Sequence, residues 1–189
     1  MKLSSIFIVS LMLFTLISGA EDKEFKDKWS KEIKLEGAKN FRKVSDLLYR
    51  SAQPDKEGMK NLKKMGVKTI INLRSFHSDR DEIGDTGLAY EHMYTKTWHI
   101  EEKEIVRFLQ IVTDPNRTPA LVHCMQGVDR TGTMCAVYRI VVEGWDKKEA
   151  IAEMKAIGHN TIWKNLPKLL ENLDVEKIRK KAGLDKKAK

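Results

Sequence analysis

Short apolar runs alternate with amphipathic stretches along most of the chain. Residues 67–73 are rich in β-branched side chains, which predicts a strand. The shorter segments 47–51, 88–93 and 120–122, which begin with apolar residues, predict three more strands. Between residues 101 and 112, apolar side chains recur every three or four positions, as on one face of a helix. This alternation predicts a single α/β domain with a mainly parallel central sheet covered by helices.

Capping residues mark where the other helices begin and end. Asp55 is placed to cap a helix that closes at Gly66, because glycine readily adopts the left-handed conformation there. Residues 131–143 are apolar on nearly every side, so this helix should be buried. Asp146 and Glu149 form a capping-box pattern for the helix that follows. A last helix is predicted from spaced apolar residues, namely Ile162, Leu166, Leu169, Leu170 and Leu173.

The first twenty residues form a segment of a different kind. Lys2 is followed by an almost wholly apolar stretch, 3–17, and then by small residues that end at Ala20. This order is typical of a signal peptide, and the apolar stretch is shorter than the roughly 20 residues that span a bilayer. We therefore expect cleavage after Ala20 and an exported protein without a stable membrane anchor; an uncleaved anchor is the alternative. A bacterial periplasm is the expected location, with eukaryotic secretion as the alternative.

Composition narrows the class of protein further. Of the 189 residues, 33% are charged and 41% hydrophobic, which excludes both a disordered chain and a polytopic membrane protein. We expect a charged lead-in at 21–39, a folded domain at 40–177 and a solvated basic tail at 178–189. Six basic residues of that tail face one acidic residue and so supply most of the formal net charge of +8. Because no aromatic residues interleave with them, no nucleic-acid partner is expected.

One segment, 123–132 (HCMQGVDRTG), carries the candidate chemistry. Cys124 follows a predicted strand, and Arg130 stands six residues later at the start of a predicted helix. Such a turn can direct backbone N–H groups at an anion, and Gly127 permits the backbone conformation that this needs. Arg130 can hold two oxygens of the anion, and the same positive field favours a Cys124 thiolate. Thr131 can donate its hydroxyl to the sulfur. A thiolate inside a phosphate cradle is arranged to attack phosphorus.

The segment resembles the C-x5-R-[ST] signature of the cysteine-based protein tyrosine phosphatases. Residues 40–54, 67–74 and 131–145 are similar to the dual-specificity branch, especially its exported bacterial members. The resemblance implies hydrolysis of phosphotyrosine, with phosphoserine or phosphothreonine as further substrates. It also implies a phosphocysteine on Cys124 and neither metal nor cofactor. The phosphate-binding residues that it implies are Met125, Gln126, Gly127, Val128, Asp129, Arg130 and Thr131.

The chain departs from the family at the general acid. An Asp on a loop upstream of the cysteine is usual, but no Asp occurs between Asp85 and Asp114. Three candidates take its place in this order: Asp129 within the cradle, His99 and Glu102. The alternative for Asp129 is a structural carboxylate that fixes a neighbouring loop. Glu102 is equally placed for the first turn of a helix, where carboxylates are favourable.

Other residues keep two interpretations each. Cys135 is expected to pack in the core, and its alternative is a resolving thiol for Cys124. Residues 75–87 are expected to form a solvated polar loop, although 75–82 could border the phosphate cleft, and Trp98 could line its mouth. The rival functions are an inositol phosphate or lipid phosphatase, indicated by Asp129 and the basic tail, a phospho-ligand binding module without the acid, and a redox protein that uses both cysteines.

Overall fold

The computed structural model describes residues 25–185 and divides the chain into two units, Met1–Ser30 and Lys31–Lys189. The predicted signal peptide, 1–20, lies outside the described residues. In the described part of the first unit, the rings of Phe25 and Trp29 meet edge to face at 5.9 Å. Within residues 25–185, no helix combines the length and the apolar character that crossing a membrane requires.

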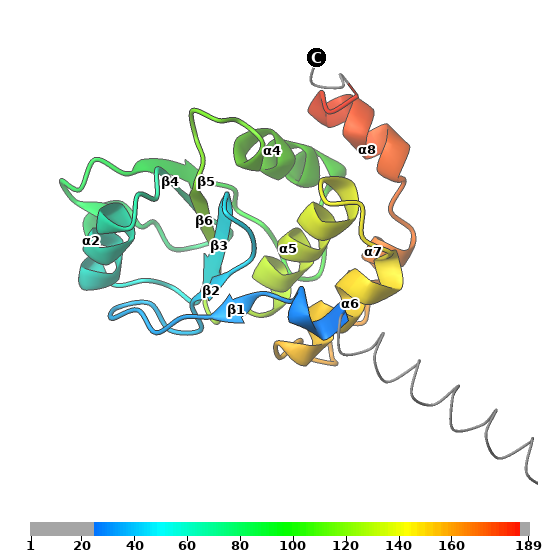
Figure 1. The fold of residues 1–189 in the computed structure, drawn as a ribbon, viewed down its shortest axis with the longest axis horizontal. Coiled ribbons are helices and arrows are strands. Elements are labelled where there is room, and N and C mark those ends of the chain that lie inside the picture. Colours follow the sequence, from blue (N-terminus) through cyan, green and yellow to red (C-terminus); the bar gives the residue numbers. More distant parts are fainter. Residues whose placement is uncertain (1–24, 186–189) are drawn as a thin grey trace, which may run out of the picture. The chain divides into compact units, whose positions relative to one another are not determined.

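A twisted sheet lies at the centre of the second unit (Figure 1). Its strands lie side by side in the order β1 (Lys31–Glu32), β2 (Arg42–Lys43), β3 (Leu48–Ser51), β6 (Ala120–His123), β4 (Thr69–Asn72) and β5 (Ala89–His92). The last four run parallel, whereas β1 and β2 add an antiparallel edge. The predicted α/β fold with a mainly parallel sheet is therefore confirmed.

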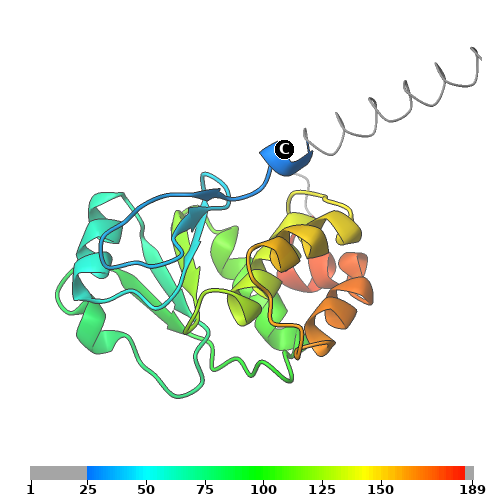
Figure 2. The same ribbon diagram turned by 90° about the horizontal axis from the view of Figure 1, so that it is seen from below.

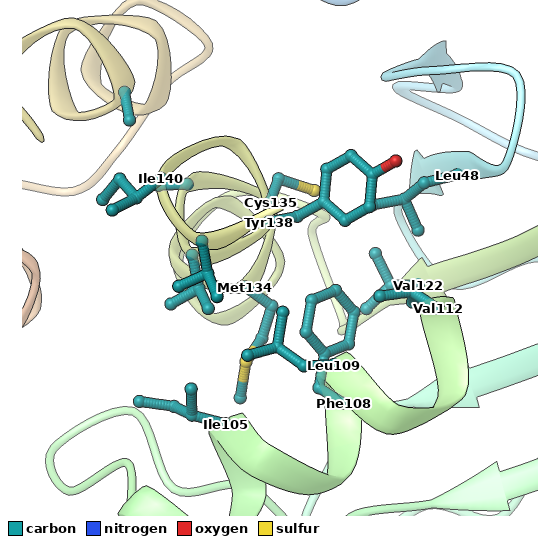
Figure 3. Close-up of a cluster of buried hydrophobic side chains, with 14 of the residues drawn as sticks. Leu48, Ile105, Phe108, Leu109, Val112, Val122, Met134, Cys135, Tyr138 and Ile140 are labelled. Carbon is teal, nitrogen blue, oxygen red and sulfur yellow. The ribbon is translucent and has the colours of Figure 1, made fainter. Parts of the chain in front are cut away.

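The central strands are buried on both faces, which explains their continuous apolar runs. Along β4, Ile71 faces helices α4 (Glu102–Val112) and α5 (Asp129–Val141), while Ile70 faces helix α2 (Lys56–Lys64). Figure 2 shows α2 on one side of the sheet and α4 and α5 on the other. In the larger core, side chains of α4 and α5 meet those of Leu48 and Val122 (Figure 3).

The predicted caps hold their helices as expected. The Asp55 carboxylate accepts the N–H of Gly58 at the start of α2, and Gly66 beyond its end has a φ of +86°. Asp146 accepts the N–H of Lys148 and so begins helix α6 (Lys147–Ala156). Each side-chain oxygen satisfies one of the N–H groups that a helix start leaves without a partner.

Two local predictions are wrong. The polar loop at 75–87 contains a short helix, α3 (Arg80–Ile83), whose Ile83 is buried against the core on the α2 side. Helix α7 (Asn165–Glu171) does not include Ile162, which is 69% exposed. Ile162 was assigned by spacing and 75–87 by its polar composition, and in both places tertiary packing decided which apolar residue is covered.

The expected domain boundaries also need correction. The lead-in was placed at 21–39, but β1 pairs with β2 and Ala38 is buried, so the folded unit begins at Lys31. The basic tail was placed at 178–189, but helix α8 (Val175–Ala182) buries Ile178 and Ala182. The basic residues of α8 lie on its other faces. The high proportion of charged residues in this segment therefore concealed the apolar face from the composition argument.

Candidate active site

The segment that joins β6 to α5 is pressed against the end of β3. Every residue of β6 is buried, and Cys124, which follows it, is buried too. Gly127 has a φ of +73°, and a Cβ added to it would lie 2.4 Å from the Ser51 carbonyl oxygen and 2.5 Å from the Ala52 nitrogen. Glycine is therefore required here both for backbone conformation and for space.

The carbonyl groups of this loop point toward β3 and its neighbours. The Met125 carbonyl accepts the Gln53 N–H (3.2 Å), and the Gln126 carbonyl accepts from Asn40 Nδ2 (3.3 Å). The Gly127 carbonyl accepts from Arg50 Nη2 at 2.6 Å. In a trans peptide the following N–H points the opposite way. The N–H groups of residues 126–128 therefore face away from β3, and no acceptor for them occurs among the described residues.

Arg130, in the first turn of α5, is fixed across the loop. Its Nη1 donates to the carbonyl oxygens of Leu73 (3.1 Å) and Thr95 (3.3 Å), which come from the end of β4 and from the segment after β5. Its other guanidinium nitrogens remain for an anion. Thr131 is buried, and its hydroxyl has no hydrogen-bond partner among the described residues. Cys124, Arg130 and Thr131 thus lie on one connection from β6 into α5, and their catalytic roles stay predictions.

An open pocket of about 240 Å³ lies over this loop. Met125 and Arg130 line it from the loop, and the side chains opposite come from two segments distant in sequence. These further lining residues are Arg74, Ser75, Phe76, Thr97 and Trp98. Trp98 at the mouth matches the expectation, and the 75–82 segment borders the cleft through Ser75 and Phe76. Phe76 nevertheless remains 97% exposed, so this part of the segment both borders the pocket and is solvated.

Comparison with known proteins assigns the chain to a protein family. The model described as "DSP-PTPase phosphatase fused to NAD+ Kinase" matches residues 28–164. The chain belongs to this phosphatase family. The predicted resemblance to the dual-specificity branch of the protein tyrosine phosphatases is thereby confirmed.

Two related proteins, one of them with crystal structures, show how far the likeness extends. Dual specificity protein phosphatase TpbA of Pseudomonas aeruginosa (strain UCBPP-PA14) is 34% identical over 120 residues, 63% of this chain and 55% of the relative. This chain spans about half the length of that curated relative. The crystal structure of P. aeruginosa TpbA superposes with a TM-score of 0.73 at 28% identity, covering 82% of this chain and 97% of that one. A cysteine-to-serine variant of TpbA in complex with phosphotyrosine gives 0.72 at 28% identity, covering 82% and 96%. Inositol diphosphatase DSP5 of Arabidopsis thaliana is 25% identical over 151 residues, 74% of this chain and 72% of the relative.

The three acid candidates of this chain lie outside the pocket lining. Asp129 Oδ1 accepts the Asn160 N–H (2.8 Å) and lies 3.1 Å from His159 Nδ1, which agrees with its structural interpretation. Hydrogen bonds from Lys177 and Lys181 lower the pKa of Glu102, which opposes a role as proton donor. His99 is exposed. The described lining contains neither a carboxylate nor an imidazole, so the acid role of Asp129 stays a prediction.

No local pattern in the sequence predicts the buried carboxylate that lies near the loop at 124–130. Asp79 is fully buried, and its Oδ2 lies 2.7 Å from Nε2 of His123, the residue before Cys124. Its Oδ1 accepts from Asn72 Nδ2 (2.9 Å) and Gln53 Nε2 (3.0 Å). Asp79 stands in a polar stretch that looks solvated, and only the tertiary fold places it against the ends of β4 and β6.

The same carboxylate belongs to a group that could be taken for a metal site. Ligand atoms of His77, Asp79 and Glu82 lie within 4.8 Å of one another. Both oxygens of Asp79 already accept hydrogen bonds from three side chains. These bonds explain the position of Asp79 without an ion, and no metal role is assigned to the group.

Cys135 lies in the core, as predicted. Figure 3 shows it beside Tyr138 on α5, with both side chains directed toward Leu48 of β3. Burial raises the pKa of Cys135 to about 11. The thiol is therefore neutral at ordinary pH, and its role as a resolving thiol stays a prediction.

Proposed function

We propose that this chain hydrolyses phosphate monoesters, phosphotyrosine foremost, through a phosphocysteine on Cys124. The Cys124 thiolate attacks phosphorus while the bond from phosphorus to the leaving oxygen breaks, and that oxygen takes up a proton. Water then attacks the phosphocysteine, the sulfur–phosphorus bond breaks, and inorganic phosphate leaves. Arg130 and the N–H groups of 126–128 hold the non-bridging oxygens through both steps.

The orientation of the loop is the observation that supports this reaction most. Three donors hold the loop carbonyls outward, so the N–H groups are oriented before any anion arrives. Preorganised donors stabilise developing charge without further reorganisation. The Arg130 guanidinium is likewise held in place by two carbonyl oxygens. A cysteine that served only to fill the core would need none of these arrangements.

The rim of the pocket supports a phosphotyrosine substrate. Phe76, Trp98 and Met125 line it, and their exposed fractions are 97%, 61% and 55%. Large apolar side chains left this exposed around a polar cradle indicate a binding surface. An aromatic ring can stack between such side chains, whereas the short stem of phosphoserine would not reach them. The phosphotyrosine complex of the related TpbA agrees with this assignment.

The test is phosphate release from p-nitrophenyl phosphate and from a phosphotyrosine peptide, without added metal. We expect turnover by the protein and none by Cys124→Ser. Cys135→Ser is the matched control, because it changes the other cysteine, and it should retain turnover. If folded protein binds phosphate but releases none from either substrate, a phospho-ligand binding module becomes the better description. If Cys124→Ser turns over normally, the phosphocysteine is refuted.

The rim is tested by Trp98→Ala. We expect a higher KM for the phosphotyrosine peptide and an unchanged affinity for inorganic phosphate, because the ring contact is lost while the cradle remains. A phosphoserine peptide should show little dependence on Trp98. Equal losses for both peptides would refute the stacking role.

A second candidate is an inositol phosphate or diphosphate. Arg74 also lines the pocket, so a second guanidinium lies near Arg130 and could hold another phosphate. The relationship to an inositol diphosphatase supports the same class. Arg74→Ala separates the two candidates: a loss confined to inositol diphosphates favours the second, and a loss confined to the phosphotyrosine peptide excludes it.

We also propose that the mature protein is exported, with the bacterial periplasm as its location. The support is the order of charged, apolar and small residues within 1–20. N-terminal sequencing of the exported protein should begin at Glu21. An intact Met1 in that fraction would refute cleavage.

A further inference from the structure

One buried cation of the fold lacks a counter-charge. Arg50 on β3 is 1% exposed, and among the described residues it takes part in no ion pair. It donates one hydrogen bond, from Nη2 to the Gly127 carbonyl (2.6 Å), and its Nε is buried without a partner. A guanidinium removed from water without a carboxylate beside it is costly, because nothing offsets the lost hydration. Burying Arg50 therefore costs stability, and its presence calls for another explanation than stability.

A second buried arginine shows the usual arrangement. Arg139 on α5 is 3% exposed, and its Nε and Nη2 bond to the Glu153 carboxylate at 3.0 and 3.2 Å. Its Nη1 bonds to Glu143 at 2.6 Å. The two arginines therefore differ in what compensates their charge rather than in how deeply they are buried.

The position of Arg50 identifies what could balance it. In the parallel register of β3 and β6, Arg50 pairs with Val122 and Ser51 pairs with His123, so Arg50 stands beside the strand end that leads to Cys124. A Cβ added to Gly132 would lie 3.6 Å from Arg50 Nη2, so the guanidinium also lies against the first turn of α5. The charge is thus located beneath the phosphate loop, on the side away from the pocket.

The charge of Arg50 also acts on a residue to which it is not hydrogen-bonded, Cys135 of α5. Burial raises the pKa of Cys135 to about 11, and the charge of Arg50 opposes this rise. Glu153 raises the same pKa further, while Arg139, its ion-pair partner, lowers it. Arg139 is already paired with Glu153 and Glu143, so Arg50 is the buried cation here that has no ion pair among the described residues.

We propose that Arg50 is a positioning residue for the phosphate site, with two effects. It holds the Gly127 carbonyl outward, which turns the next N–H toward the anion, and it supplies from beneath the loop a positive charge that attracts a bound phosphate. Arg50 does not touch the substrate. This inference rests on the phosphate chemistry proposed above, and it assigns a function to a strand residue outside the C-x5-R motif.

The test compares stability with anion binding in the Cys124→Ser background, where no turnover is needed. Inorganic phosphate is titrated by calorimetry, and unfolding is followed by its thermal midpoint. Arg50→Met should keep or raise the midpoint, since an uncompensated buried charge is removed. It should lower phosphate affinity about tenfold or more, since one oriented loop carbonyl and one nearby charge are lost. Arg50→Lys keeps the positive charge but not the planar guanidinium donors, so its phosphate affinity should lie between those of the Cys124→Ser protein and the Arg50→Met variant.

Arg139→Met is the matched control, because it removes a buried arginine that is paired. We expect a lower thermal midpoint and unchanged phosphate affinity in the folded protein. If Arg50→Met instead lowers the midpoint or fails to fold, the charge is not a liability and the inference is overturned. The same conclusion follows if it folds with unchanged phosphate affinity, or if Arg50→Lys recovers none. Phosphate binding that depends on Arg50 in a protein without phosphatase turnover would refute the proposed hydrolysis and leave this inference standing.

Discussion

The clearest quantitative prediction concerns Gly127→Ala. Two separate effects oppose this substitution: the φ of +73°, which alanine adopts reluctantly, and a Cβ placed 2.4–2.5 Å from backbone atoms of Ser51 and Ala52. Gly144 offers a matched position, because its φ is also +73° and a Cβ added there would meet nothing within 4 Å. The difference between the two alanine variants therefore isolates the contact with β3 from the backbone strain.

The expected magnitudes follow from these geometries. Gly144→Ala should lower the free energy of unfolding by about 1 kcal/mol, the strain of a left-handed alanine. Gly127→Ala adds the overlap with backbone atoms and weakens the Arg50 bond to the Gly127 carbonyl, which brings the loss to about 3 kcal/mol. Relieving the overlap requires the loop to move by about 1 Å, and a displacement of that size can lower kcat roughly 100-fold.

Urea unfolding and p-nitrophenyl phosphate turnover of both variants provide the assay. We expect Gly144→Ala to retain kcat, because it lies at the far end of α5, and Gly127→Ala to lose both stability and turnover. Equal losses of unfolding free energy in the two variants would show that the contact with β3 carries no energetic weight. A Gly127→Ala protein with normal kcat would refute the placement of the loop.

Three further outcomes are expected. Asp79→Asn should lower the free energy of unfolding by about 2 kcal/mol, since a buried carboxylate that accepts three hydrogen bonds is lost, whereas exposed Asp81→Asn should not change the urea midpoint. Cys135 has a folded-state pKa of about 11, raised from 9.0, so the neutral thiol contributes about 3 kcal/mol to the free energy of unfolding below pH 9, and this contribution is lost as pH rises to 11. The difference in unfolding free energy between the protein and Cys135→Ala should therefore shrink over that range. A constant difference would refute the raised pKa. Glu102→Gln should preserve the acidic limb of the pH–rate profile, because lysine hydrogen bonds lower the pKa of Glu102 and keep it ionised. The same limb is then measured in Asp129→Asn and His99→Asn. Loss of the limb in Glu102→Gln would make Glu102 the first candidate for the general acid.

Local chemistry was readable from the chain wherever neighbours in sequence are also neighbours in space. The strand at 120–123, the cysteine after it, Gly127 and Arg130 all lie within one connection, so their spacing predicts the cradle. The caps at Asp55 and Asp146 were predicted for the same reason, because each bonds to an N–H two or three residues away. The buried parallel strands followed from their apolar runs.

Contacts between distant segments were decided by the tertiary structure alone. Asp79 lies 44 residues before His123, and Arg50 lies 77 before Gly127, so no local pattern connects them. Asp79 stands in a stretch that looks polar and exposed, whereas Arg50 stands in a predicted strand, and the burial of both follows only once β3, β4 and β6 lie side by side. The proton donor belongs to this class too, because its identity depends on which side chain reaches the pocket.

Segment boundaries show the same division. A single buried side chain such as Ile83 or Ile178 brings a charged segment into the fold, and composition cannot reveal it. Composition averages over the faces of a helix, whereas packing acts on one face only. The sequence by itself therefore determined the class of fold and predicted the nucleophile and the cradle. The tertiary structure decided what lies beneath the cradle, because burial and charge compensation depend on neighbours that are distant along the chain.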